Sequence, residues 1–142
     1  IAGGAQLGDP TERALLSAAR AVPRIVLPGF LSGRPLAELF SHAGLFVLPS
    51  LYEGLPIALL EALSYGLPVA VSDIPPHREI PLPPFRYFPP AAPAALAGKI
   101  AECLERGITE EERASALGLL RRDFDWDAIA ERTLAVYRSA LP

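Results

Sequence analysis

The chain has 142 residues, of which 51% are hydrophobic and 20% charged, and its formal net charge is −3. This length and apolar content predict one folded domain over residues 1–142 and exclude general disorder. The absence of a basic surplus argues against a dedicated nucleic-acid-binding protein. A single cysteine, Cys103, excludes an internal disulfide and a multi-cysteine zinc site. No apolar run approaches the roughly 18 residues of a transmembrane helix.

The first half of the chain alternates helical and extended patterns. It begins with Ile1 and runs into Gly3-Gly4, so we expect a piece of a larger protein, cut at or inside a strand. A capping Asp9 followed by Pro10 predicts a helix that ends near Ala21. The elements expected next are a strand at 24–27, a helix from 35 to about 44 and a buried strand at 45–48.

The second half continues the alternation and then becomes mainly helical. Pro56 at a helix start and Gly66 just past a helix end predict a helix over 56–65. A buried strand follows at 68–71, and the proline-rich stretch 74–93 is expected to be mostly loop, with a short strand at 87–88. Helices are expected at about 93–104, 109–120 and 126–140, the last one with an apolar stripe that includes Trp126 and Tyr137.

Fully apolar strands joined by short helical connections are typical of a parallel sheet. The predicted fold class is therefore α/β, a Rossmann-like parallel sheet with helices on both faces. In such sheets, ligands bind beyond the carboxyl ends of the strands. The segments to inspect for a site are therefore 3–4, 28–32, 49–56 and 72–77.

The segment after the second predicted strand carries the most chemistry. Glu53 lies in this loop, and Gly54 allows the backbone to approach a ligand closely. The amides of Leu55 and Ile57 open a helix, where unpaired N–H groups and the helix dipole favour an anion such as phosphate. Pro56 has no N–H, so only some amides can contribute.

Glu61 is the one charge on a helix that is otherwise almost entirely apolar. A helix that is apolar all round is expected to be buried, so Glu61 needs a partner. The hydroxyls of a sugar or ribose fit, because a carboxylate accepts two hydrogen bonds from a diol. The alternative is structural: Glu53 would be a solvated loop acid, and Glu61 would pair with an arginine.

Residues 25–80 resemble the nucleotide-sugar-binding half of retaining glycosyltransferases of family 4 (group 1), which have the GT-B fold. The resemblance rests on Phe46-Val47-Leu48-Pro49-Ser50, Glu53-Gly54-Leu55-Pro56, Leu60-Glu61-Ala62 and Gly66-Leu67-Pro68-Val69-Ala70. Glu53 and Glu61 coincide with the family's E-x7-E motif. The family often has Phe-Gly where this chain has Leu55-Pro56.

The resemblance implies a role for each of these residues. Glu53, the catalytic candidate, would hold hydroxyls of the donor sugar near the reacting carbon. Glu61 would bind the ribose diol. The backbone of Gly54, Leu55, Pro56 and Ile57 would contact the diphosphate or the sugar, and Gly29, Phe30 and Leu31 would lie near the base.

The resemblance also implies a reaction. The donor would be a UDP-, GDP- or ADP-sugar, and transfer of the hexosyl group would retain the anomeric configuration without a metal or another cofactor. The chain would be half of a GT-B enzyme, with its first strand and helix truncated. An acceptor-binding N-terminal domain and the basic phosphate-binding residues would precede Ile1. The fragment by itself would be inactive, and the whole enzyme would be cytoplasmic or peripheral at the membrane surface.

Three alternatives remain open at this point. A GT-B relative could hydrolyse or epimerise a nucleotide sugar, and a non-catalytic binding module could keep the fold without the reaction. A receiver-type signalling domain also alternates strands and helices, but it needs an acidic cluster after its first strand and a late lysine. Lys99, the only lysine, lies in a predicted helix.

Four other residues have simpler interpretations. Ser50 has no acid–base partner at a recognisable spacing, so no hydrolase triad is proposed. His77 is expected in an ordinary ion-pairing turn, Cys103 in the core of a helix face, and Trp126 as an anchor of the last helix.

Overall fold

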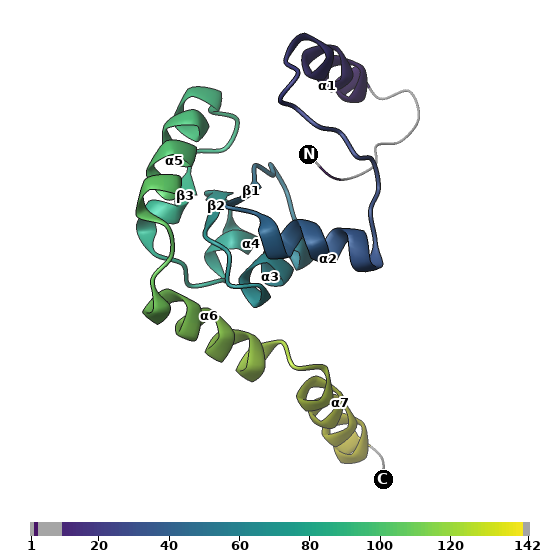
Figure 1. Ribbon diagram of the computed structural model, residues 1–142. Coiled ribbons are helices and arrows are strands. Elements are labelled where there is room, and N and C mark those ends of the chain that lie inside the picture. Colours follow the sequence, from purple (N-terminus) through teal and green to yellow (C-terminus); the bar gives the residue numbers. More distant parts are fainter. Residues whose placement is uncertain (1, 3–9, 141–142) are drawn as a thin grey trace. The chain divides into compact units, whose positions relative to one another are not determined.

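The computed structural model describes residue 2 and residues 10–140 (Figure 1). The chain divides into two compact units, Ile1–Ser41 and His42–Pro142. Gly3, Gly4 and Asp9 were singled out in the sequence, and they lie outside the described residues.

The first unit holds two helices. Helix α1 spans Pro10–Ala21, as predicted, and α2 spans Gly33–His42, so it begins earlier than the expected residue 35. The strand expected at 24–27 is wrong. A strand needs a continuous ladder with a neighbour, and the described part of this unit offers only a single parallel bridge between Ala2 and Gly29. Val26 accordingly remains 68% exposed.

The second unit is a parallel sheet with its connecting helices. Strands β1, β2 and β3 are adjacent in that order, and both pairs are parallel. The strands are Phe46–Leu48 (β1), Val69–Ser72 (β2) and Tyr87–Phe88 (β3). The helices are Ile57–Ser64 (α3), Pro75–Arg78 (α4), the 3-10 helix Pro84–Arg86 (η1), Pro93–Arg106 (α5), Glu110–Asp123 (α6) and Trp126–Ala140 (α7).

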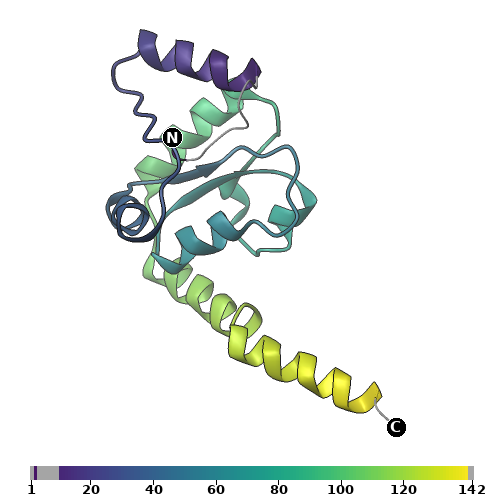
Figure 2. The ribbon, with the colours of Figure 1, turned by 90° about the vertical axis from the view of Figure 1, so that its right-hand side faces the viewer.

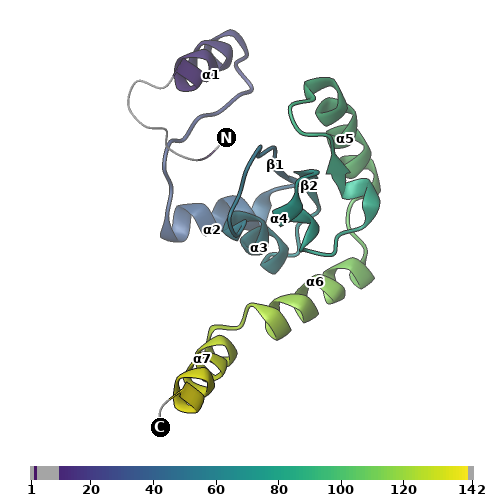
Figure 3. The same cartoon turned by 180° about the vertical axis from the view of Figure 1, so that it is seen from behind.

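Helices cover both faces of the sheet, as the apolar strands predict. On one face Ala70 and Phe88 pack with Cys103 of α5, and all three are buried. Helix α3 lies on the opposite side of the sheet from α5 (Figures 1 and 2), and α6 lies against α3 (Figure 3). The predicted core role of Cys103 and the α/β fold class are therefore confirmed.

Local sequence signals explain where α3 and α6 end and begin. The Leu67 N–H donates to the Ala62 carbonyl, and Gly66 follows α3 with a φ of 67°. This is a Schellman ending, and it uses the left-handed conformation that glycine adopts at no steric cost. Thr109 caps α6 in a reciprocal capping box with Glu112.

The proline-rich stretch 74–93 is more ordered than predicted. The short strand at 87–88 is confirmed, but α4 and η1 were expected to be loop. Pro75 stands in the first turn of α4, where a missing N–H costs no helical hydrogen bond. Ile74, just before it, is extended and buried, and it holds the start of the helix.

Helix α7 has the predicted bounds but not the predicted contacts. Trp126 is 80% exposed and Tyr137 is 65% exposed. Among the described residues of α7, none is buried, so the apolar stripe anchors nothing here. An apolar stripe shows which side of a helix can be buried, and a covering surface must still be present to bury it.

Tyr87 ties the proline-rich stretch to the sheet. Its hydroxyl donates to the Ile80 carbonyl at 2.7 Å and accepts from the Leu82 N–H at 3.3 Å. The Arg78 guanidinium lies 4.1 Å from the centre of its ring. Burial raises the pKa of the Tyr87 phenol above its ordinary value.

Removing the Tyr87 hydroxyl should therefore destabilise the second unit. We expect Tyr87→Phe to lower the free energy of unfolding by about 1 kcal/mol, because the Ile80 carbonyl and the Leu82 N–H each lose one hydrogen bond and keep only the one between them. Urea unfolding followed by circular dichroism measures this, with Tyr52→Phe as the control, since Tyr52 is 86% exposed. Equal unfolding midpoints for the two variants would contradict the assigned role.

Candidate functional site

The candidate site lies at the carboxyl edge of the sheet, where β1 and β2 end. Leu48 pairs with Val71, so the residues that follow both strands emerge side by side. The loop after β1 carries Glu53 and leads into α3. The residues after β2 lead through Asp73 into α4.

Glu53 is held at this edge and is not a freely solvated loop acid. Its side chain is half-buried, and Ser50 Oγ donates to Glu53 Oε1 at 2.6 Å. Gly54 is exposed and has open space where a side chain would stand. The loop thus leaves room beside a carboxylate whose orientation is already constrained.

The start of α3 differs from the expectation in one respect. Pro56 precedes the helix with φ −77° and ψ 71°, the geometry of an inverse γ-turn. The Ile57 N–H therefore donates to the Leu55 carbonyl at 2.8 Å. The prediction that the Ile57 amide is unpaired and ready for a phosphate is wrong, because this tight turn occupies it.

Glu61 is exposed, which corrects the expectation of a buried charge. The buried face of α3 consists of Leu59, Ala62 and Leu63. Ile57, which is 61% exposed, lies one turn before Glu61 on the outer side of the helix. An apolar composition does not require burial on every side, and nothing in the described chain covers this stripe.

The structural alternative for Glu61 was a pairing with arginine. Within residues 10–140, no basic side chain lies at ion-pair distance from its carboxylate. The carboxylate therefore faces solvent with both oxygens available to a ligand.

Ser72 and His77 belong to the same edge. The sequence marked 72–77 as a segment to inspect, but it did not predict the contacts that these two residues make. Ser72 is fully buried, and its Oγ donates to the Ser50 carbonyl at 2.5 Å. His77 is also fully buried, and its Nδ1 lies 2.7 Å from the Ser72 carbonyl. The expected ion-pairing turn at His77 is wrong: Arg78 makes the ion pair, while His77 points into the protein.

Asp73 and Arg78 form the ion pair at the turn between β2 and α4. Arg78 Nε donates to one Asp73 oxygen at 2.5 Å, and Nη2 donates to the other at 2.7 Å. These hydrogen bonds hold the pKa of the Asp73 carboxyl below its ordinary value. The same pair raises the pKa of Arg78.

Gly29, Phe30 and Leu31, the residues predicted to lie near the base, belong to the first unit. Gly29 has a φ of 75°, and Phe30 is 77% exposed. Their proximity to a nucleotide base stays a prediction.

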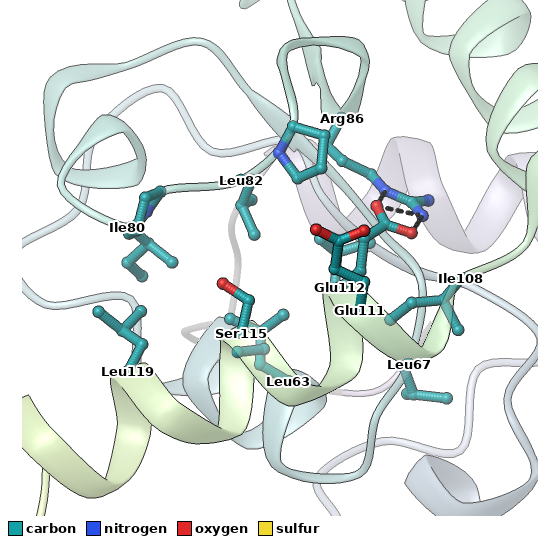
Figure 4. Close-up of a pocket in the computed structure, with 14 residues that line it drawn as sticks. Leu63, Leu67, Ile80, Leu82, Arg86, Ile108, Glu111, Glu112, Ser115 and Leu119 are labelled. Carbon is teal, nitrogen blue, oxygen red and sulfur yellow. Dashed lines mark hydrogen bonds and ion pairs between the residues drawn. The ribbon is translucent and has the colours of Figure 1, made fainter.

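A separate hollow of about 430 Å³ lies between α3, α6 and the proline-rich stretch (Figure 4). Among the strands it reaches only Val69, at the amino end of β2, so it opens away from the edge that carries Ser50 and Ser72. Arg86 lines it and is held by Glu112 Oε1 at 3.1 Å. None of the site residues predicted from the sequence lines this hollow.

The described residues contain no group of three or more histidine, cysteine or acidic side chains placed to hold a metal ion. None of their helices combines the length and the apolar character that crossing a membrane requires.

The amino-acid sequence matches a known protein family. The family described as Glycosyl transferases group 1 matches residues 1–106. The chain belongs to this family. The match includes the loop with Glu53, helix α3 and the turn that carries Ser72 and His77.

Two relatives illustrate the similarity. An uncharacterized glycosyltransferase of Methanocaldococcus jannaschii is 31% identical over 121 residues, which covers 83% of this chain and 31% of that protein. The O-antigen chain mannosyltransferase B of Escherichia coli is 30% identical over 111 residues, covering 78% of this chain and 29% of that protein. The chain thus spans less than a third of these relatives.

Solved structures agree on the GT-B fold. Sucrose-phosphate synthase from Thermosynechococcus elongatus superposes with a TM-score of 0.78 at 25% identity, covering 97% of this chain and 37% of that chain. The catalytic domain of cholesterol-alpha-glucosyltransferase from Helicobacter pylori gives 0.63 at 26% identity, covering 79% of this chain and 73% of that chain. The resemblance inferred from the sequence is confirmed at the level of family and fold.

The Asp73–Arg78 pair should make stability depend on pH. A lowered carboxyl pKa in the folded state adds stability above the ordinary aspartate pKa, and this is lost as the pH falls through the lowered value. We expect Asp73→Asn to lower the urea midpoint near neutral pH, and the difference from wild type to shrink toward pH of about 2.

Glu105→Gln serves as the control, because Glu105 is an exposed carboxylate on α5. A difference between Asp73→Asn and wild type that stays constant across this pH range would show that the ion pair contributes nothing to folding.

Proposed function

We propose that this chain binds a nucleoside diphosphate sugar at the carboxyl edge of its sheet, as the donor half of a retaining glycosyltransferase. The observation that carries the proposal is a pair of carboxylates, Glu53 in the loop before α3 and Glu61 within that helix. Glu53 is oriented by Ser50, and Glu61 is exposed without a basic partner among the described residues. Both stand within the segment matched to a glycosyltransferase family.

Each of the two carboxylates would bind a different part of the donor. Glu61 offers both oxygens to solvent, which suits a pair of adjacent hydroxyls such as a ribose diol. Glu53 keeps the oxygen that Ser50 does not occupy free for a sugar hydroxyl. The diphosphate and the sugar would pass beside Gly54, where nothing lies within 4 Å of the position of a side chain.

The backbone of Gly54, Leu55 and Pro56 would lie along the diphosphate, and Ile57 would contribute its side chain, because its N–H is taken by Leu55. The donor is a UDP-, GDP- or ADP-sugar.

Catalysis would come from positioning the sugar and from stabilising charge on the leaving diphosphate. No metal and no other cofactor is part of the proposal. Transfer in the presence of a chelator, with the anomeric configuration of the product read by NMR, tests the metal-independent and retaining features together.

The acceptor would be bound by protein outside these 142 residues. The chain spans 31% of the M. jannaschii relative and 29% of the E. coli one, so most of such an enzyme lies elsewhere. Basic residues that neutralise the diphosphate would come from the same missing part. The chain by itself should therefore bind the donor weakly and transfer no sugar, and sugar transfer by these residues alone would contradict this.

Glu61→Ala should weaken nucleotide binding by about tenfold or more, because a charged acceptor of ribose hydroxyls is lost. Ligand-observed NMR titrations with UDP, GDP and ADP measure this on the chain as it stands. Glu105→Ala is the matched control, an exposed acidic residue on a helix distant in sequence from the site. Unchanged nucleotide affinity in Glu61→Ala would show that Glu61 does not bind the ribose.

Glu53→Gln should instead act on the sugar. In the full-length enzyme we expect kcat to fall by about a hundredfold or more, since a preorganised charge at the reacting centre is lost. Affinity for the nucleotide without its sugar should change less than about threefold. Product analysis of the full-length wild-type enzyme checks the reaction itself. Hydrolysis or epimerisation of the donor, in place of transfer to an acceptor, would contradict the proposed glycosyl transfer.

A further inference from the structure

The carboxylate of Glu53 is the last link of a hydrogen-bond chain that crosses the edge of the sheet. Ser50 Oγ is the donor to Glu53 Oε1, at 2.6 Å. A hydroxyl that donates to one carboxylate oxygen restricts the rotation of the carboxylate and leaves its other oxygen for a ligand. The orientation of Glu53 therefore depends on where Ser50 is held.

Ser50 is held by the neighbouring strand. It stands in the loop beyond β1, where ladder hydrogen bonds have ended, and its carbonyl accepts from Ser72 Oγ at 2.5 Å. Ser72 is the last residue of β2 and is fully buried. A buried hydroxyl with a fixed acceptor has one orientation, so this contact ties the loop to a rigid strand.

Ser72 is in turn tied to α4. His77 Nδ1 lies 2.7 Å from the Ser72 carbonyl and 3.3 Å from Ser72 Oγ. A carbonyl only accepts, so Nδ1 must carry a hydrogen and donate it. In a neutral imidazole this leaves the lone pair on Nε2.

His77 Nε2 is buried and has no hydrogen-bond partner among the described residues. An unsatisfied buried polar atom is destabilising, and an apolar side chain would avoid this cost. Among the described residues, the hydrogen bonds of the imidazole are all made by Nδ1 toward Ser72.

We propose that Ser50, Ser72 and His77 are positioning residues that hold the Glu53 carboxylate toward the sugar of the donor. This inference rests on the proposed function of Glu53. Two of the three links end on backbone carbonyls, which pass no proton onward. These hydrogen bonds therefore fix the position of the Glu53 carboxylate and do not relay protons.

Substitutions of these three residues should weaken binding of the sugar part of the donor and leave binding of the nucleotide part nearly unchanged. The measured quantity is the ratio of the affinities for UDP-glucose and UDP, with GDP-mannose and GDP or ADP-glucose and ADP as the other pairs. We expect Ser50→Ala, Ser72→Ala and His77→Leu each to lower this ratio by about three- to tenfold, with nucleotide affinity nearly unchanged.

A matched pair at one position separates positioning from packing. His77→Asn keeps a side-chain N–H near the place of Nδ1 and should retain the wild-type ratio, whereas His77→Leu should not. Ser115→Ala controls for loss of a serine hydroxyl, because Ser115 is an exposed residue of α6 beside the hollow at the other edge. Ser50→Ala, at a half-buried loop position, tests the role of these hydrogen bonds even where His77→Leu fails to fold.

A second measurement needs no ligand. NMR couplings and relaxation of the Glu53 side chain should report one rotamer in the wild-type chain and in His77→Asn, and averaging between rotamers in Ser50→Ala. A single rotamer preserved in Ser50→Ala and Ser72→Ala would overturn the proposal, whatever the chain binds.

The two proposals fail in different ways. If the wild-type chain prefers the nucleotide sugar and Glu53→Gln removes that preference while Ser50→Ala and Ser72→Ala keep it, the positioning role is wrong and the function stands. If Glu53→Gln leaves every affinity ratio unchanged while the rotamer of Glu53 responds to Ser50→Ala, the role of Glu53 toward the sugar is wrong and the positioning stands.

Discussion

Strands β1 and β2 run in parallel, in a register that sets Leu48 beside Val71, and the candidate site depends on this pairing. Parallel strands end at the same edge of a sheet, so Ser50 and Ser72 meet there, and the Ser72 hydroxyl reaches the Ser50 carbonyl. An antiparallel arrangement would send these residues to opposite edges. Because the Ser50 hydroxyl donates to the Glu53 carboxylate, this contact also sets the position of Glu53.

Different interactions stabilise the fold of this chain and hold the residues of its candidate site in position. The two faces of the sheet are covered by α5 and by α3 with α6, and apolar contacts dominate there. The edge is held by buried or half-buried hydrogen bonds, because the loop after β1 leaves Leu51 and Tyr52 exposed and so buries little of its apolar surface. A loop fixed by polar contacts to a rigid strand can present a carboxylate while its outer side stays open to a ligand.

The exposed faces of α3 and α7 have one physical cause. Ile57 and Glu61 face outward on α3, and Trp126 and Tyr137 are exposed on α7. An apolar or mixed helix face is buried only where another surface meets it. On α3, this leaves the Glu61 carboxylate uncovered and more available than a buried charge would be.

The sequence by itself determined the α/β fold, most helix bounds, the three strands of the sheet and the family, because these follow from local periodicity, caps and a motif in a continuous stretch. It also singled out Glu53 and Glu61. Only the tertiary structure decided that Glu61 is exposed, that the Ile57 amide is occupied, and that residues 24–27 form no strand. The contact of the Ser72 hydroxyl with the Ser50 carbonyl joins residues 22 positions apart. It forms only when parallel strands bring their ends together, and no local pattern encodes that. The contact of His77 with Ser72 spans five positions, and the inward orientation of the imidazole was decided by its burial in the folded chain.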